Sequence, residues 1–162
     1  MIFVTVGTEK FPFDRLLKAI DEALQKKETE QEIFAQTGCS IYKPQFFSHK
    51  EYIDFGEMVK FIQKSDIVIT HAGIGTAILC LSLGKIPILF PRDVAFGEHL
   101  DNHQIDFARK MEVFGKVLVA FDYEELINKI KDYKKIVSSL KLSSTSNHSK
   151  RELITYLKKI TI

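Results

Sequence analysis

A chain of 162 residues is long enough for one domain with a hydrophobic core of its own. Hydrophobic residues make up 45% of the chain and charged residues 27%, which excludes a disordered or fibrous protein, and the net charge of +2 gives no reason to expect nucleic acid as a partner. Cys39, Cys80 and the five histidines lack the spacing of metal ligands, so we expect no metal and a reduced, cytoplasmic chain.

The first half of the chain predicts three short strands and one helix. Residues 2–6 are an apolar run rich in β-branched side chains, typical of a buried strand in a parallel sheet. Because the chain enters this run without basic residues or a long apolar stretch, we expect neither a signal peptide nor a membrane span. Apolar side chains then recur at helical spacing over residues 12–26. Further strands are expected at residues 32–36 and 45–47.

The second half alternates strands and helices with clearer boundaries. Met58 and Ile62 mark a helix, Gly84 ends a later one, and Asp122 is placed to cap another. The expected strands are residues 67–70, 87–90 and 117–120, and the expected helices are residues 76–83, 102–111 and 123–140. We therefore predict one domain over residues 1–142, a polar hinge at residues 143–149 and a C-terminal helix at residues 150–162.

This alternation predicts an α/β fold with a Rossmann-like, doubly wound parallel sheet. Sheets of this kind bind ligands beyond the carboxyl ends of their strands. Three segments follow predicted strands and carry polar groups or glycine: Gly7-Thr8, the loop that opens at His71, and residues 91–104. We expect all three to lie at the same edge of the sheet.

The loop after the strand at residues 67–70 is a candidate anion site. Gly73 and Gly75 let the chain turn sharply, and Ile74 and Thr76 lie at the start of the following helix, whose free N–H groups attract a phosphate or diphosphate. A third glycine for a dinucleotide fingerprint and a Walker lysine are both missing from this loop. The alternative is a tight strand-to-helix turn that uses glycine for its geometry alone.

The roles of His71 and of the Gly7-Thr8 pair are also open. His71 would bind a phosphate oxygen or donate a proton as a catalytic group, or else it merely closes the turn. Gly7 and Thr8 would expose backbone amides and a hydroxyl to a ligand, or else only end a strand.

The segment Asp101-Asn102-His103-Gln104 combines hydrogen-bond donors and acceptors of the kind that sugar hydroxyls require. Asp101 and Asn102 also suit the N-cap of a helix, which is the alternative role for one of them. A nucleophilic triad and paired glycosidase carboxylates are not evident, and Cys80 falls in an apolar helix typical of a core.

Four motifs then follow one another in a familiar order. They are VTVGT at residues 4–8 followed by Phe13-Asp14 and Leu16, SDIVITHAGIGT at residues 65–76, LGKIP at residues 83–87, and DNHQ at residues 101–104. Together they resemble the C-terminal domain of family 28 glycosyltransferases over nearly the whole chain. More narrowly, the chain is similar to the small donor-binding subunits of two-chain transferases, among them the dolichol-linked GlcNAc transferase and bacterial capsule and exopolysaccharide counterparts.

The resemblance implies the C-terminal half of a GT-B glycosyltransferase, a hexosyltransferase active only with a partner. This lobe would bind the UDP-sugar donor, and a membrane-anchored partner subunit would supply the lobe that binds a lipid-linked saccharide acceptor. The implied chemistry is a direct, inverting displacement without a metal or other cofactor, at the inner face of the membrane. Gly73, Ile74, Gly75 and Thr76 would contact the diphosphate, with Gly7 and Thr8 across the cleft edge, the chain near Phe55 at the uracil, and Asp101, His103 and Gln104 at the sugar.

One position departs from the family pattern. Related sequences commonly place a ribose-binding glutamate where this chain has Leu79, which cannot accept those hydrogen bonds. This departure favours an alternative, a non-catalytic module that stabilises or activates a partner glycosyltransferase. An unrelated Rossmann-type nucleotide-binding protein is a further alternative. The apolar face of the last helix, formed by Leu153, Ile154, Leu157 and Ile160, either packs on its own domain or docks a partner.

Overall fold

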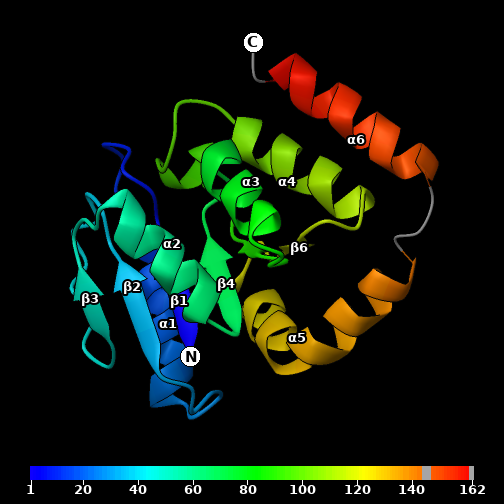
Figure 1. The fold of residues 1–162 in the computed structure, drawn as a ribbon. Helices are drawn as coiled ribbons and strands as arrows, with labels where there is room; N and C mark the ends of the chain where they lie inside the picture. Colours follow the sequence, from blue (N-terminus) through cyan, green and yellow to red (C-terminus); the bar gives the residue numbers. More distant parts are fainter. Residues whose placement is uncertain (144–146, 161–162) are drawn as a thin grey trace.

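A computed structural model describes residues 1–143 and 147–160, without the side chains of residues 141–151 (Figure 1). Its centre is a six-stranded sheet in the order β3-β2-β1-β4-β5-β6, and every neighbouring pair of strands is parallel. The strands are β1 (Ile2–Thr5), β2 (Ile33–Gln36), β3 (Ser48–Lys50), β4 (Ile67–Thr70), β5 (Ile88–Leu89) and β6 (Leu118–Val119). The helices are α1 (Asp14–Gln25), α2 (Phe55–Lys64), α3 (Ile74–Ser82), the 3-10 turn η1 (Val94–Phe96), α4 (His103–Val113), α5 (Tyr123–Ser143) and α6 (Asn147–Ile160).

The helices cover both faces of the sheet, with α1 behind it and α2 and α3 in front (Figure 1). Side chains alternate between the faces along each strand: Ile67 and Ile69 of β4 pack in the cluster with α1 and α5, whereas Val68 packs with α2 and α3. Both faces are therefore buried, which explains why β1 and β4 are apolar up to the threonine that ends each of them. The predicted α/β fold with a doubly wound parallel sheet is confirmed.

The order of the strands places a topological switch point between β1 and β4. The chain builds β1, β2 and β3 in one direction and then returns to add β4, β5 and β6 on the other side of β1. At the carboxyl end of this pair, Thr5 lies opposite Thr70, and the N–H of His71 donates to the carbonyl of Thr5 at 3.2 Å. Loops after β1 and β4 thus meet where open α/β sheets bind ligands.

The strand expected at residues 45–47 is wrong, because β3 lies three residues later. The N–H groups of Gln45 and Phe46 donate to the buried carboxylate of Asp21, at 2.7 and 3.0 Å, so they are taken by a side chain instead of a sheet ladder. Tyr42 donates to the same carboxylate from its hydroxyl. A helix thus anchors this loop before the chain joins the sheet.

The C-terminal helix packs on its own domain. Leu153, Tyr156, Leu157 and Ile160 contact the cluster that contains Phe107 and Met111 of α4, and Figure 1 shows α6 lying alongside α4. Ile154, expected on the same apolar face, is 53% exposed.

The boundaries of the predicted hinge are also wrong, because α5 includes Ser143 and α6 begins at Asn147. The rest of that hinge, residues 144–146, lies outside the described residues, as do residues 161–162 of the predicted C-terminal helix. In the described part of the chain, no helix is long and apolar enough to span a bilayer.

Candidate functional site

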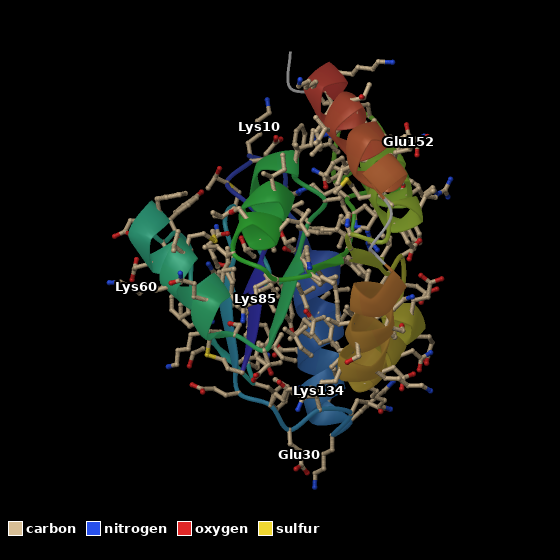
Figure 2. All side chains as sticks on the ribbon, turned by 45° about the vertical axis from the view of Figure 1, so that its right-hand side comes forward. Lys10, Glu30, Lys60, Lys85, Lys134 and Glu152 are labelled. Atoms are coloured by element: carbon tan, nitrogen blue, oxygen red, sulfur yellow. The ribbon has the colours of Figure 1, made fainter. Side chains whose placement is uncertain are left out.

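The carboxyl edge of the sheet carries all three predicted ligand loops. Figure 2 shows Lys10, in the loop after β1, at the opposite end of the molecule from Glu30 and Lys134. The loop after β4 leads into α3 through Gly73, whose backbone is extended and which provides no side chain to cap the helix. Gly75 is exposed, and Ile74 and Thr76 are half-buried. The first N–H groups of α3 thus lack a side-chain cap at the switch point, an arrangement suited to an anion.

His71 supports this turn from inside. A Cβ added to Gly73 would lie 2.2 Å from His71 Nε2, and one added to Gly7 would lie 2.5 Å from His71 Cε1, so the imidazole fits between the two glycine backbones. Its Nδ1 lies 3.2 Å from the hydroxyl of Thr70. Burial, aided by the positive charge of Arg92, lowers the pKa of His71 to about 4. The ring is therefore neutral near pH 7, and the predicted catalytic role for it stays a prediction.

This buried imidazole predicts a specific dependence of stability on pH. The unfolded chain binds a proton at His71 near pH 6.5 and the folded chain only near pH 4, so the unfolded state holds more protons between those values. Stability is therefore lost as the pH falls from 6.5 to 4, by about 3 kcal/mol from this group. Urea titrations across that range should show a steeper fall for the natural protein than for His71→Gln; equal slopes would contradict the assignment.

The loop after β1 approaches the same place. Gly7 has φ +79°, which favours glycine, and its carbonyl accepts a hydrogen bond from Gln36 Nε2 at 2.9 Å. Thr8 is exposed beside it. Phe55 is 72% exposed at the start of α2, after β3, which β2 separates from β1. The structure thus brings Gly7, His71 and Gly73 together, whereas Phe55 lies further along the edge.

The sugar-binding candidates divide into exposed groups and one buried group. Asp101, Asn102 and His103 are exposed, and the Asp101 carboxylate accepts from the N–H of His103 at 3.0 Å and contacts its Nδ1. Asn102 precedes α4 but makes no side-chain cap. Gln104 is only 2% exposed, and its Oε1 accepts from the N–H of Arg92 at 3.2 Å. Its oxygen therefore joins α4 to the end of β5.

A group of possible metal-ligating atoms lies in this loop. Among the described residues, His99, Asp101 and His103 place such atoms within 4.8 Å of one another. The same atoms form ordinary polar contacts: Asp101 with both rings, and His99 Nε2 with Glu9 at 3.4 Å. The expected absence of a metal stays a prediction.

Sequence reasoning missed a network of charged side chains beneath these loops. Glu98, nearly buried, accepts from Arg15 Nε at 2.9 Å and Arg15 Nη2 at 2.8 Å, and from the N–H of Asp93 at 3.0 Å. Arg15 also donates to the carbonyls of Pro91 and Phe121. Helix α1 is thus tied to the ends of β5 and β6. An arginine in an amphipathic helix gives no sign in the sequence of a partner 83 residues away.

Two further features bear on the site. Leu79, at the position of the expected ribose-binding glutamate, packs against the cluster of Phe3, Ile62 and Cys80 between α2 and α3. A hollow of about 640 Å³ lies between α1 and the ends of β5 and β6, lined in part by Arg15 and Phe96. The predicted donor-binding residues do not line this hollow, and they stand instead on the edge of the sheet.

A six-stranded parallel sheet with helices on both faces and a switch point between β1 and β4 defines a fold of the Rossmann-like class. The model of the glycosyltransferase family 28 C-terminal domain matches residues 1–156, and the chain belongs to this family. It is 33% identical over 124 residues to the human protein named UDP-N-acetylglucosamine transferase subunit ALG13, an alignment that covers 70% of this chain and 10% of the human protein.

Solved glycosyltransferases share the fold. MurG of Acinetobacter baumannii aligns with a TM-score of 0.56 at 15% identity, covering 96% of this chain and 49% of that one. SnogD of Streptomyces nogalater gives 0.58 at 17% identity, covering 86% and 36%, and the calicheamicin glycosyltransferase CalG4 gives 0.58 at 15% identity, covering 99% and 44%. The chain therefore spans less than half the length of these structures, and its predicted likeness to one half of a GT-B glycosyltransferase is confirmed at the level of the fold.

Proposed function

We propose that this chain is the donor-binding, catalytic subunit of a two-component inverting glycosyltransferase that transfers a sugar from a UDP-sugar to a lipid-linked acceptor. The observation that carries the proposal is the helix start at Gly73, which lacks a side-chain cap and lies at the switch point between β1 and β4. Membership in family 28 supports glycosyl transfer as the reaction. The name of the human relative, a subunit of a UDP-N-acetylglucosamine transferase, supports a UDP-sugar donor and a subunit role.

The geometry suggests how the donor would be held. The diphosphate would bind the N–H groups of Ile74, Gly75 and Thr76, whose partial positive charge would stabilise UDP as it leaves. Asp101 and His103 would hydrogen-bond the sugar, and uracil would lie toward Phe55. Neutral His71 would support the turn by filling the space between Gly7 and Gly73.

A partner would complete the active site. The donor-binding residues stand on an open edge, and several apolar side chains on the same edge are exposed: Phe55 by 72%, Phe96 by 65% and Leu100 by 78%. The chain also spans only 36–49% of the solved transferases that it resembles. A second, membrane-anchored lobe that binds the acceptor would cover this edge and hold the subunit at the cytoplasmic face of the membrane, in polysaccharide biosynthesis.

The test has two stages. Calorimetric titration of the whole chain with UDP, and with ADP for comparison, should give saturable binding that prefers UDP. Co-expression with the product of a neighbouring gene, followed by a screen of UDP-sugars on membrane extracts, should then give transfer that neither chain supports alone. A preference for ADP would favour an unrelated nucleotide-binding protein, and full transfer by the isolated chain would contradict the need for a partner.

Leu79 favours a second candidate, a non-catalytic module that activates a partner transferase. Its half-buried side chain packs against the core cluster between α2 and α3 and cannot accept hydrogen bonds from ribose. This candidate requires that the chain does not bind UDP at millimolar concentration while its partner still depends on it for activity.

A further inference from the structure

Arg92 is a fully buried cation between the loops of the candidate site. Among the described residues, its guanidinium donates only to backbone carbonyls: those of Val6 at 2.8 Å, Phe11 at 2.7 Å, Pro12 at 3.2 Å and Glu98 at 3.3 Å. It also stacks over the ring of Phe13, 4.7 Å from the ring centroid. One side chain thus holds the loop after β1 and the loop after β5 at a fixed separation.

The charge of Arg92 is solvated mainly by backbone dipoles, and among the described residues no carboxylate oxygen accepts a hydrogen bond from it. Burial lowers the pKa of Arg92 and outweighs the charges of Glu9 and Glu98, which act on it from further away. The carboxylate of Glu98 is taken by Arg15 and the N–H of Asp93, and Glu98 contacts Arg92 through its carbonyl alone. The Nε of Arg92 is buried and has no hydrogen-bond partner among the described residues. A buried charge is costly unless it is paired, so this arrangement favours an anion bound nearby.

The guanidinium connects to both halves of the candidate site. Val6, whose carbonyl it binds, immediately precedes Gly7, and Gly7 is backed by the ring of His71 with Gly73 on the other side. The N–H of Arg92 donates to Gln104 in the first turn of α4. The positive charge of Arg92 also contributes to the lowered pKa of His71, so its field extends into the turn that precedes α3.

We propose that Arg92 is a positioning residue of the donor site, which sets the separation of the two loops and provides a buried positive charge that favours a bound diphosphate. This inference rests on the proposed function, because it takes the donor to be a nucleoside diphosphate sugar. Arg92 acts through the backbone of the loop after β1 and through its field. Its contribution is therefore to the diphosphate and not to the nucleoside.

The test compares the affinities of UDP and uridine, measured by calorimetry on the full-length chain. In Arg92→Gln the ratio of the two affinities should fall about tenfold, because only UDP interacts with the lost charge. Arg92→Lys keeps the positive charge but lacks the planar guanidinium group and its several donors. It should therefore retain most of the ratio of the UDP and uridine affinities while lowering the melting temperature. Arg109→Gln removes a positive charge from an exposed position and should leave the ratio unchanged.

The pKa of His71, followed by NMR of its ring, gives a second readout that requires no ligand. It should rise in Arg92→Gln and stay low in Arg92→Lys, provided that circular dichroism shows both variants folded. If the role of Arg92 were purely structural, Arg92→Gln would weaken the binding of UDP and of uridine equally. An unchanged ratio of the two affinities in Arg92→Gln therefore overturns the proposal even if UDP binds. Absence of UDP binding by the natural protein would overturn both this inference and the proposed function.

Discussion

Replacing Gly73 with alanine is expected to abolish measurable UDP binding and to destabilise the fold by roughly 1–3 kcal/mol, the usual effect of overpacking a buried site. The backbone of Gly73 is ordinary, with φ −73° and ψ 125°, so any residue can adopt it. The obstacle is the neighbouring ring, because the new Cβ would lie 2.2 Å from His71 Nε2. His71 would have to leave its buried position, and the turn into α3 would move with it. Calorimetry with UDP and urea denaturation measure the two effects.

Gly75 provides the matched control, because a Cβ there would meet no atom within 4 Å. Gly75→Ala should keep the fold and gain roughly 0.5–1 kcal/mol from the better helix former. It should still weaken the binding of UDP, since the methyl group would occupy the exposed face of the helix start. The double variant His71→Ala/Gly73→Ala should recover part of the stability lost in Gly73→Ala. Natural UDP affinity in Gly73→Ala would show that the donor does not use this turn.

Replacing Glu98 with alanine is expected to cost about 3 kcal/mol of stability, at the lower end of the range for breaking a buried ion pair. The Glu98 carboxylate is 6% exposed and binds both nitrogens of one edge of Arg15, so its removal leaves that cation with two backbone carbonyls. Arg15 is 22% exposed, and this access to water keeps the loss from being larger. The N–H of Asp93 would also lose its acceptor.

Urea denaturation of the natural protein and of three variants separates the effect of ion pairing from the effect of packing. Arg15→Met/Glu98→Leu should be more stable than Glu98→Ala, because it removes both charges and fills the space with apolar atoms. Glu51→Ala, which breaks the exposed pair with Lys43, should have no measurable effect. If Glu98→Ala were as stable as Glu51→Ala, the network would not hold the loops of the candidate site.

Local patterns predicted most of the sheet and its helices. The strands β1 and β4, which are apolar except for a final threonine, and the amphipathic helix α1 could be predicted from their own residues. A strand buried on two faces is almost entirely apolar, and a helix buried on one face is apolar at helical spacing. The strand expected at residues 45–47 was wrong, because its N–H groups bind Asp21, which is 24 residues distant from Gln45. Hydrophobic patterns do not record such a side-chain anchor.

For the candidate site, the sequence indicated the loops but not their supports. Glycines at positions 7, 73 and 75 and the polar run at residues 101–104 are visible as motifs, and parallel topology brings the ends of their strands to one edge. The burial of His71 between two glycines depends on how the loops after β1 and β4 meet. A histidine in a polar loop is expected to be exposed, so no local pattern could predict that the ring of His71 is buried and neutral inside the turn.

By itself, then, the sequence determined the class of fold and indicated the edge of the sheet and the glycines of the candidate anion site, because periodicity and turn chemistry are properties of short segments. Only the tertiary structure decided which charged residues are buried. The bonds of Arg92 to Val6 and of Arg15 to Glu98 span 86 and 83 residues. An arginine is stable in the interior only where distant backbone and carboxylate oxygens converge on it, and that convergence exists only once the sheet has brought the loops together.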